Sequence, residues 1–208
     1  GNSSPCAASW DAGPLRIRLK RFTSVVLGLC FSSISSAMSL EINYEEKIVT
    51  NAFHGTSAEN AVSIQQNGFK PSEGNNQYLG DGVYFYLNSK WHAEIWASRR
   101  RKYDNIAVFE AIIDLGTCLN LVKPEHRKLI KKVFNKLKGR GCEDVTDAAA
   151  INFFASNICS IDTVMAVYVQ PEYGKIDPNS RFYDYVQNLL CVRNAGNIVE
   201  YDVVRLDN

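Results

Sequence analysis

The chain has 208 residues, and 46% of them are hydrophobic, which is enough apolar material for one domain with a sizeable core. Lys and Arg number 23 against 22 for Asp and Glu, so the net charge of +1 excludes a chain that is strongly basic throughout, while a local basic patch stays possible. The composition also excludes a disordered or fibrous protein. No apolar run reaches about eighteen residues without a polar interruption, so we expect no membrane-spanning helix and no membrane partner.

The cysteines and histidines predict neither disulfides nor a metal site. Six cysteines stand at irregular spacing without a Cys-x-x-Cys pair, and a domain of this size does not need disulfides. We therefore expect reduced thiols and a cytoplasmic location. The three histidines, His54, His92 and His126, do not fall at metal-ligand spacings with cysteines or acidic residues.

Residues 1–38 are predicted to be a leader or N-terminal extension, and residues 39–208 to be one domain. Basic residues between Arg16 and Arg21 precede a moderately apolar run from Phe22 to Ile34, an order typical of a signal peptide. On that alternative, the protein is secreted or is a translocated effector. Several Ser and Thr residues dilute the run, which favours an ordinary packed segment or a leader upstream of a start at Met38.

Short helices alternate with strands in the first half of the domain. The patterns predict strands over 48–53, 83–86, 106–113 and 119–122, and helices over 57–67 and 89–101. Ser57 can cap the first helix and Gly68 can end it. Residues 69–78 are polar and predict a loop, which leads into a tight turn at Gly80-Asp81-Gly82.

The second half contains the clearest helix, from Pro124 to Lys138, because its apolar residues form one stripe. A helix over 146–157 and a strand over 163–170 follow, and strands over 188–192 and 197–206 are expected to pair as a terminal hairpin. This mixed order predicts an α+β domain of two packed, mainly antiparallel β-sheets with flanking helices.

Two segments combine flexible backbone with groups that can contact a ligand. Phe53-His54-Gly55-Thr56 ends a predicted strand, where glycine allows close approach and the neighbouring side chains supply hydrogen bonds. Two glycines, Gly80 and Gly82, precede the aromatic strand that contains Tyr84, and a tyrosine face can hold a flat ring. Taken alone, each segment is more often structural.

Taken together, these segments resemble the diphtheria-toxin-like ADP-ribosyltransferases, which include the poly(ADP-ribose) polymerase catalytic domains, and especially the bacterial toxin-like members. The matching residues are Phe53-His54-Gly55-Thr56, Ile64-x-x-x-Gly68-Phe69, Gly80-Asp81-Gly82-Val83-Tyr84-Phe85 and Ser89-Lys90. The remaining residues follow the family in element order only. The resemblance implies the ADP-ribosyltransferase fold, with NAD as substrate.

The resemblance also implies roles for individual residues. His54 would grip the adenosine ribose, the Gly55 backbone would bind the nicotinamide amide, and Tyr84 would stack on the nicotinamide ring. A second aromatic residue belongs near Ile95, one position out of register, and we assign this role to Trp96. The residues assigned to NAD binding are His54, Gly55, Thr56, Gly82, Tyr84, Trp96 and Asn188.

The sequence departs from the family at the catalytic glutamate of a late strand. Gln187 is the best match, Asn188 is second, and the nearest carboxylates are Asp184 and Glu200. We therefore predict His54, Tyr84 and Gln187 as the catalytic set. Glutamine can hydrogen-bond the ribose but carries no charge, and the resemblance implies that members without the glutamate transfer a single ADP-ribose or are inactive.

A basic helical face is the remaining candidate for a partner site. It contains Lys128, Lys131, Lys132 and Lys136, and residues 99–102 form a second basic cluster. The first face is either a solvated side of an amphipathic helix or a surface for an acidic partner, such as nucleic acid, an antitoxin or an immunity protein.

The sequence therefore predicts an NAD-dependent mono-ADP-ribosyltransferase that modifies a protein or nucleic acid and releases nicotinamide. The alternative is a catalytically decayed module that binds ADP-ribose, nucleic acid or a partner protein. An RNA 2′-phosphotransferase shares the fold but would need a set of phosphate-gripping His and Arg residues, which the sequence does not present convincingly. No P-loop or Gly-x-Gly-x-x-Gly motif is present, so the NAD prediction depends on the resemblance.

Overall fold

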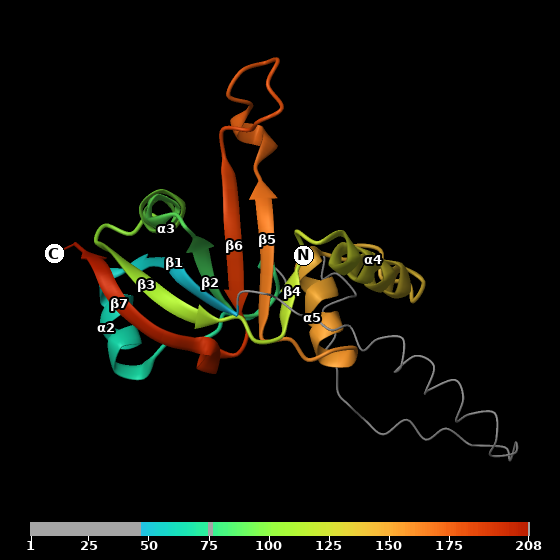
Figure 1. Ribbon diagram of the computed structural model, residues 1–208, viewed down its shortest axis with the longest axis horizontal. Coiled ribbons are helices and arrows are strands. Elements are labelled where there is room, and N and C mark those ends of the chain that lie inside the picture. The colour runs from blue at the N-terminus through green and yellow to red at the C-terminus, as the bar shows by residue number, and fades with distance from the viewer. Residues whose placement is uncertain (1–46, 75–76, 208) are drawn as a thin grey trace, which may run out of the picture. The chain divides into compact units, whose positions relative to one another are not determined.

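The computed structural model describes residues 47–74 and 77–207 (Figure 1). The predicted leader, residues 1–38, lies outside the described residues. None of the described helices is both long enough and apolar enough to cross a membrane.

Seven strands of the described chain form one sheet in the order β4-β5-β6-β2-β1-β3-β7. Only the β4–β5 pair is parallel. The strands are β1 (Ile48–Ser57), β2 (Val83–Leu87), β3 (Ile106–Asp114), β4 (Cys118–Asn120), β5 (Thr163–Val169), β6 (Val186–Val192) and β7 (Ile198–Leu206).

The helices begin at the capping residues that the sequence indicates. Three helices begin with a side chain that accepts a hydrogen bond from a backbone N–H of the first turn. These side chains belong to Ser57, Ser89 and Thr146, and they satisfy N–H groups that have no partner within the helix. The helices are α2 (Ala58–Asn67), α3 (Lys90–Ile95), the π-helix η2 (Trp96–Arg100), α4 (Pro124–Lys138) and α5 (Asp147–Asn157), with 3₁₀ turns η3 (Pro171–Tyr173) and η4 (Ala195–Asn197).

The sheet is weakly joined between β1 and β2. Their ladder contains only the pairs Ala52–Leu87 and Phe53–Tyr86, whereas β1 pairs with β3 along most of its length. The sheet therefore consists of a β7-β3-β1 half and a β2-β6-β5-β4 half, which diverge beyond Phe53.

The two faces of the sheet bury separate apolar clusters. One cluster joins Ala93 of α3 and residues of α4 and α5 to the sheet, including Ile130 and Phe154. The other contains Ala61 of α2 with Phe85 and Phe109. Figure 1 shows α2 and α3 on opposite sides of the β1, β3 and β7 strands, in agreement with these clusters.

The α+β prediction is confirmed, but two details differ from the expected arrangement. The strands are hydrogen-bonded into one sheet rather than two, because β2 pairs with β6 on one side and with β1 on the other. The expected terminal hairpin is wrong: β6 lies between β5 and β2, and β7 pairs with β3 at the sheet edge. The short connection between β6 and β7 suits a hairpin, but both ladders of β6 are already used.

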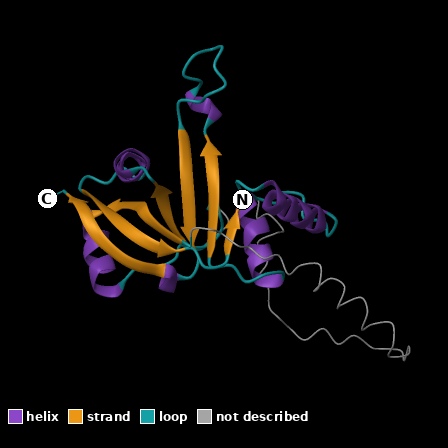
Figure 2. Ribbon diagram, viewed as in Figure 1, coloured by secondary structure: helices purple, strands orange, loops and turns teal. Residues whose placement is uncertain are grey.

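A long segment, residues 170–185, connects β5 to β6 and projects beyond the sheet (Figure 2). Its base lies directly before Gln187, and its exposed apolar residues include Ile176 and Phe182.

Candidate functional site

A cavity of about 440 Å³ lies where β1 and β2 separate. Its lining includes six of the seven residues assigned to NAD by sequence, namely His54, Gly55, Thr56, Gly82, Tyr84 and Trp96, together with Gln187. The structure thus gathers residues from β1, β2, η2 and β6 around one space.

His54 has a fixed orientation in this cavity. Its Nδ1 atom lies 2.8 Å from the backbone oxygen of Tyr84, and because a carbonyl only accepts, Nδ1 carries the proton and Nε2 is left as an acceptor. The ring packs edge-on against Phe69 at 5.2 Å and lies 5.7 Å from Phe85. Burial lowers the pKa of His54, so the imidazole is neutral at pH 7.

The backbone of Gly55 faces the cavity because the β1–β2 ladder ends before it. The backbone N–H of Asn88 donates to the backbone oxygen of Asn51 at 2.8 Å, and two residues further along β1, Phe53 pairs with Tyr86. Because alternate residues of a strand direct their N–H and C=O groups to the same neighbour, odd-numbered residues of β1 from Asn51 onward direct these groups toward β2. Gly55 is the next such residue, and it would pair with Tyr84. That pairing is not formed, so the N–H and C=O of Gly55 are available to a ligand that carries both a donor and an acceptor.

Gly55 is also required by the packing of α3. A Cβ atom at this position would lie 2.7 Å from the carbonyl carbon of Ala93 and closer still to its oxygen. Any larger residue would therefore push α3 away from β1. The same glycine thus permits helix packing and exposes the backbone to the cavity.

Tyr84 is held by the turn that precedes its strand. Its hydroxyl donates to the Gly80 oxygen at 2.7 Å and accepts from the Leu79 N–H at 2.8 Å. Burial raises the pKa of the Tyr84 hydroxyl, which stays protonated. The ring is therefore a fixed, neutral surface of the cavity.

The turn at residues 80–82 is fixed to α5 and to Arg193, the residue that follows β6. The side-chain oxygen of Asn152 accepts from the Asp81 N–H at 3.0 Å and from Arg193 Nη1 at 2.8 Å. Arg193 Nη1 also donates to the Asp81 oxygen at 3.1 Å. Gly82 is needed here because it has φ +155° and a Cβ atom would approach Cys191 Sγ to 2.5 Å. Sequence reasoning did not identify Asn152 or Arg193, because they are distant from the turn in the chain.

Trp96 lines the cavity, and Ile95 is absent from its lining. Trp96 begins the π-helix, in which the Arg101 N–H bonds the Trp96 oxygen at 2.9 Å. Such wide turns are frequent at functional sites. Trp96, one position away from the place that the resemblance indicates, therefore still presents an aromatic ring to the cavity.

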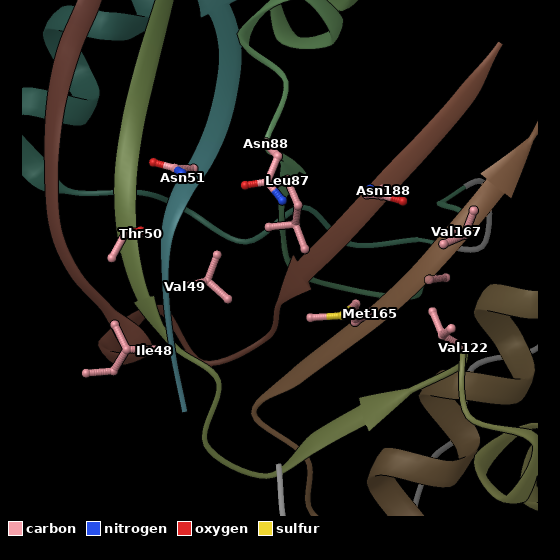
Figure 3. Close-up of a pocket in the computed structure, with 11 residues that line it drawn as sticks. Ile48, Val49, Thr50, Asn51, Leu87, Asn88, Val122, Met165, Val167 and Asn188 are labelled. Carbon is pink, nitrogen blue, oxygen red and sulfur yellow. The ribbon is translucent and has the colours of Figure 1, made fainter. Parts of the chain in front are cut away.

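Gln187 and Asn188 lie on opposite faces of β6, as adjacent strand residues must. Gln187 is buried and lines the cavity, whereas Asn188 is exposed and lines a second cavity of about 350 Å³. Figure 3 shows Asn188 in that second cavity with Leu87, Met165 and Val167. The assignment of Asn188 to the same site as His54 is therefore wrong for geometric reasons. Burial raises the pKa of the Tyr185 hydroxyl, and the neighbouring side chain of Gln187 opposes this shift.

The cavity contains two cationic residues and no carboxylate among the described residues that line it. The cations are Lys70 and Arg101. Neither Asp184, in the projecting segment, nor Glu200, on β7, is part of the lining. This balance of charge suits an anionic ligand.

Several lining residues were missed by the sequence analysis. Polar side chains of Asn60, Ser63 and Ser72 line the cavity near α2, and Tyr86 lies beside Tyr84. Tyr86 could have been found from strand alternation, since residues 84 and 86 share one face. The polar residues have no comparable signal, because they come from a helix and a loop.

The four lysines of α4 lie outside this cavity. Lys128, Lys131, Lys132 and Lys136 are exposed, whereas Ile130, Val133 and Leu137 pack inward. Figure 1 shows α4 beside α5 and β4. Lys136 lies 5.6 Å over the ring of Phe153. A partner bound by this lysine face stays a prediction, but the basic residues that line the cavity are Lys70 and Arg101, which directly follows η2.

Comparison with known proteins provides one relative and no family. No protein-family model matches the sequence. An uncharacterized protein from Methanocaldococcus jannaschii, MJ0359, is 28% identical over 181 residues, which cover 70% of this chain and 83% of that protein. Its name assigns no activity, so the functional argument depends on the site itself.

Proposed function

We propose that the protein is an NAD-dependent mono-ADP-ribosyltransferase of the ADP-ribosyltransferase fold. The observation that carries the proposal is the convergence of His54, Gly55, Tyr84 and Gln187 on one cavity. These residues are separated by up to 133 positions in the chain (187 − 54 = 133), so their meeting is not a consequence of sequence proximity. The near-division of the sheet between β1 and β2 supports the two-sheet arrangement of that fold.

The chemistry of each group fits a part of NAD. The unpaired N–H and C=O of Gly55 suit the carboxamide of nicotinamide, which has one acceptor and one donor group to offer. The Tyr84 and Trp96 rings suit the flat nicotinamide. The unprotonated Nε2 of His54 can accept from a ribose hydroxyl, and Lys70 and Arg101 can offset pyrophosphate charge.

In the reaction, the bond between the ribose C1 and the nicotinamide nitrogen breaks, and nicotinamide leaves as a neutral molecule with the bonding electron pair. The acceptor then donates an electron pair to C1 and loses a proton to water. Gln187 would hold the ribose hydroxyls by hydrogen bonds without offsetting the positive charge that develops at C1. The protein therefore acts mainly by positioning, and we expect a slow transferase.

The second candidate is a binding module that holds NAD or ADP-ribose without cleaving it. No carboxylate lines the cavity among the described residues, whereas a cation, Arg100, is connected to the base of β6. Arg100 Nη2 donates to the side-chain oxygen of Gln170 at 2.8 Å. The backbone N–H of Gln170 donates to the backbone oxygen of Tyr185, which lies two residues before Gln187. A fixed positive charge there disfavours a positive ribosyl centre.

Incubation with NAD labelled in the adenylate part tests the proposal. Wild-type protein should release nicotinamide and transfer label to a macromolecule, and His54→Ala and Tyr84→Ala should reduce both to background. Tyr183→Ala, a tyrosine change outside the cavity, is the matched control and should retain activity. Tight NAD binding without nicotinamide release would instead establish the binding module.

A further inference from the structure

A cluster of aromatic rings continues from the cavity at Gln187 to the outer surface. It consists of Tyr86, Trp91, His92, Tyr173 and Tyr185 and is called the aromatic cluster below. Tyr86 lines the cavity and stacks on His92 at 5.7 Å, with an interplanar angle of 18°. Tyr185 packs edge-on against His92 at 5.1 Å, and the Gln187 side chain is near enough to act on the pKa of its hydroxyl. The cluster therefore begins beside the predicted reacting centre.

The inner rings are buried and support two outer rings that are open to solvent. Tyr86 and Tyr185 are buried, whereas Trp91 is 53% exposed and Tyr173 is 46% exposed. Tyr173 stacks on Tyr185 at 4.8 Å and 25°, and Trp91 lies 6.0 Å from Tyr185. The outer rings are thus held in place by packing while large parts of their surface are available for contact.

Arginine side chains surround the outer rings. The guanidinium of Arg100 lies 5.4 Å over the Tyr173 ring and is bonded to the Tyr173 hydroxyl and to Gln170. Arg99, Arg101 and Lys102 are exposed beside it. Glu94, on the preceding helix, is paired with Arg205 at 3.3 Å, so the cationic run keeps its positive potential.

We propose that the aromatic cluster and the 99–102 cations bind a base and the phosphates of single-stranded nucleic acid, the acceptor of the reaction. Open aromatic faces beside cations are the combination that binds unpaired bases, because every base has a π-face and every nucleotide carries a phosphate. A duplex base is stacked and paired, so it cannot reach Trp91 or Tyr173 without being extruded.

This inference rests on the proposed function, because it supplies the acceptor for that reaction. A base seated on the outer rings would place its strand at the side of the cavity that Tyr86 and Gln187 line, from which an acceptor can approach the ribose C1. A lone pair on the base or on its sugar forms the new bond to C1 as the bond to nicotinamide breaks. Nicotinamide takes the bonding electrons, and the acceptor proton passes to water.

Binding is tested first without NAD, by fluorescence anisotropy with labelled single-stranded DNA and RNA of about 10 nucleotides. The wild-type protein should bind at low salt, more weakly as salt rises, and should prefer single strands to the matching duplex. Trp91→Ala should weaken binding roughly tenfold, in the range found for loss of one stacked base. Phe182→Ala is the matched control, because Phe182 is 73% exposed on the projecting segment and should leave affinity unchanged.

The role of the 99–102 cations is tested by how the affinity for single-stranded oligonucleotides depends on salt concentration. Arg100→Gln should reduce the slope of log affinity against log salt by about 0.7, the value for one phosphate contact to a single strand. Arg127→Gln, an exposed arginine of α4, should leave the slope unchanged. Equal affinities for the Trp91→Ala and Phe182→Ala variants, or no binding by the folded wild-type protein at low salt, would overturn the inference.

Transfer is then measured by the mass of the oligonucleotide after incubation with NAD. Trp91→Ala should lose most of the ADP-ribosylated product while nicotinamide release without oligonucleotide stays at the wild-type rate. Oligonucleotide binding through Trp91 without nicotinamide release would uphold this binding site and refute the proposed function. Nicotinamide release with modification of protein but not of either nucleic acid would refute this inference and leave the proposed function intact.

Discussion

The Nδ1 atom of His54 lies 2.8 Å from the backbone oxygen of Tyr84, thirty positions later in the chain. This bond replaces the strand pairing that Gly55 and Tyr84 would otherwise make, because it occupies the Tyr84 oxygen. The two sequence motifs are therefore joined directly. The same contact keeps β1 and β2 connected where their ladder has ended and leaves the Gly55 backbone facing the cavity.

Because the His54 imidazole is buried, we expect the free energy of unfolding to fall at low pH. Burial lowers the pKa of His54 from its usual 6.5, so below about pH 6.5 the unfolded chain takes up a proton that the native protein resists. The stabilising effect is complete above that pH and is lost as pH falls. His92 and His126 have pKa values lowered by burial as well and add to the decline.

His54→Asn separates the contribution of His54, because asparagine offers an N–H donor near the place of Nδ1 and does not titrate. Chemical denaturation between pH 5 and pH 7.5 should give a shallower decline for the variant, by at most about 1.4 kcal/mol per pH unit. Parallel curves for the two proteins would show that His54 does not resist protonation.

Gly55→Ala should disturb the contact between β1 and α3. The added methyl group meets the carbonyl of Ala93, and overpacking of this kind costs about 1–3 kcal/mol of unfolding free energy. Gly139→Ala is the matched change at a surface position, because Gly139 has helical backbone at φ −63°, and it should remain within about 0.5 kcal/mol of wild type. Equal stabilities of the two variants by urea denaturation would contradict the packing described for α3.

Asn152→Ala should loosen the turn that holds Tyr84. It removes the acceptor for the Asp81 N–H and for Arg193, and loss of these part-buried hydrogen bonds costs roughly 1 kcal/mol. We expect lower stability together with weaker NAD binding by calorimetry. Asn157→Ala on the same helix removes only a local bond to the Phe153 oxygen and serves as the control. If both variants bind NAD as wild type does, the turn does not position the site.

Gln187→Glu should accelerate nicotinamide release, because a carboxylate stabilises the positive ribosyl centre. One charge-assisted bond corresponds to roughly one to two decades of rate. Asn188→Glu places the same charge on the other face of β6 and should have no effect. Equal rates for wild type and Gln187→Glu would refute the electrostatic role of this position.

Most of the secondary structure could be predicted from the sequence, because its signals are local. Ser57 and Gly68 bound α2 as expected, and the apolar stripe of α4 places Ile130 and Val133 inward. Strand pairing could not be predicted in the same way. The segments after Asn188 and Asn197 have the spacing of a hairpin, yet β6 and β7 lie in different halves of the sheet, because pairing depends on partners far away in the chain.

The site shows the same division between local and distant information. The motif residues His54, Gly55 and Tyr84 stand out in the sequence because their spacing resembles that of the ADP-ribosyltransferases. Asn188 was misassigned because a one-residue step on a strand reverses the face. The aromatic cluster joins α3 and η3 to Tyr185, the residue before β6, and no local pattern connects those segments.

The position of NAD in a crystal of the complex tests the central claim most directly. We predict the nicotinamide ring against Tyr84, its carboxamide on the N–H and C=O of Gly55, and the adenosine ribose at Nε2 of His54. NAD in the cavity lined by Leu87 and Met165, or no bound NAD at saturating concentration, would contradict the account.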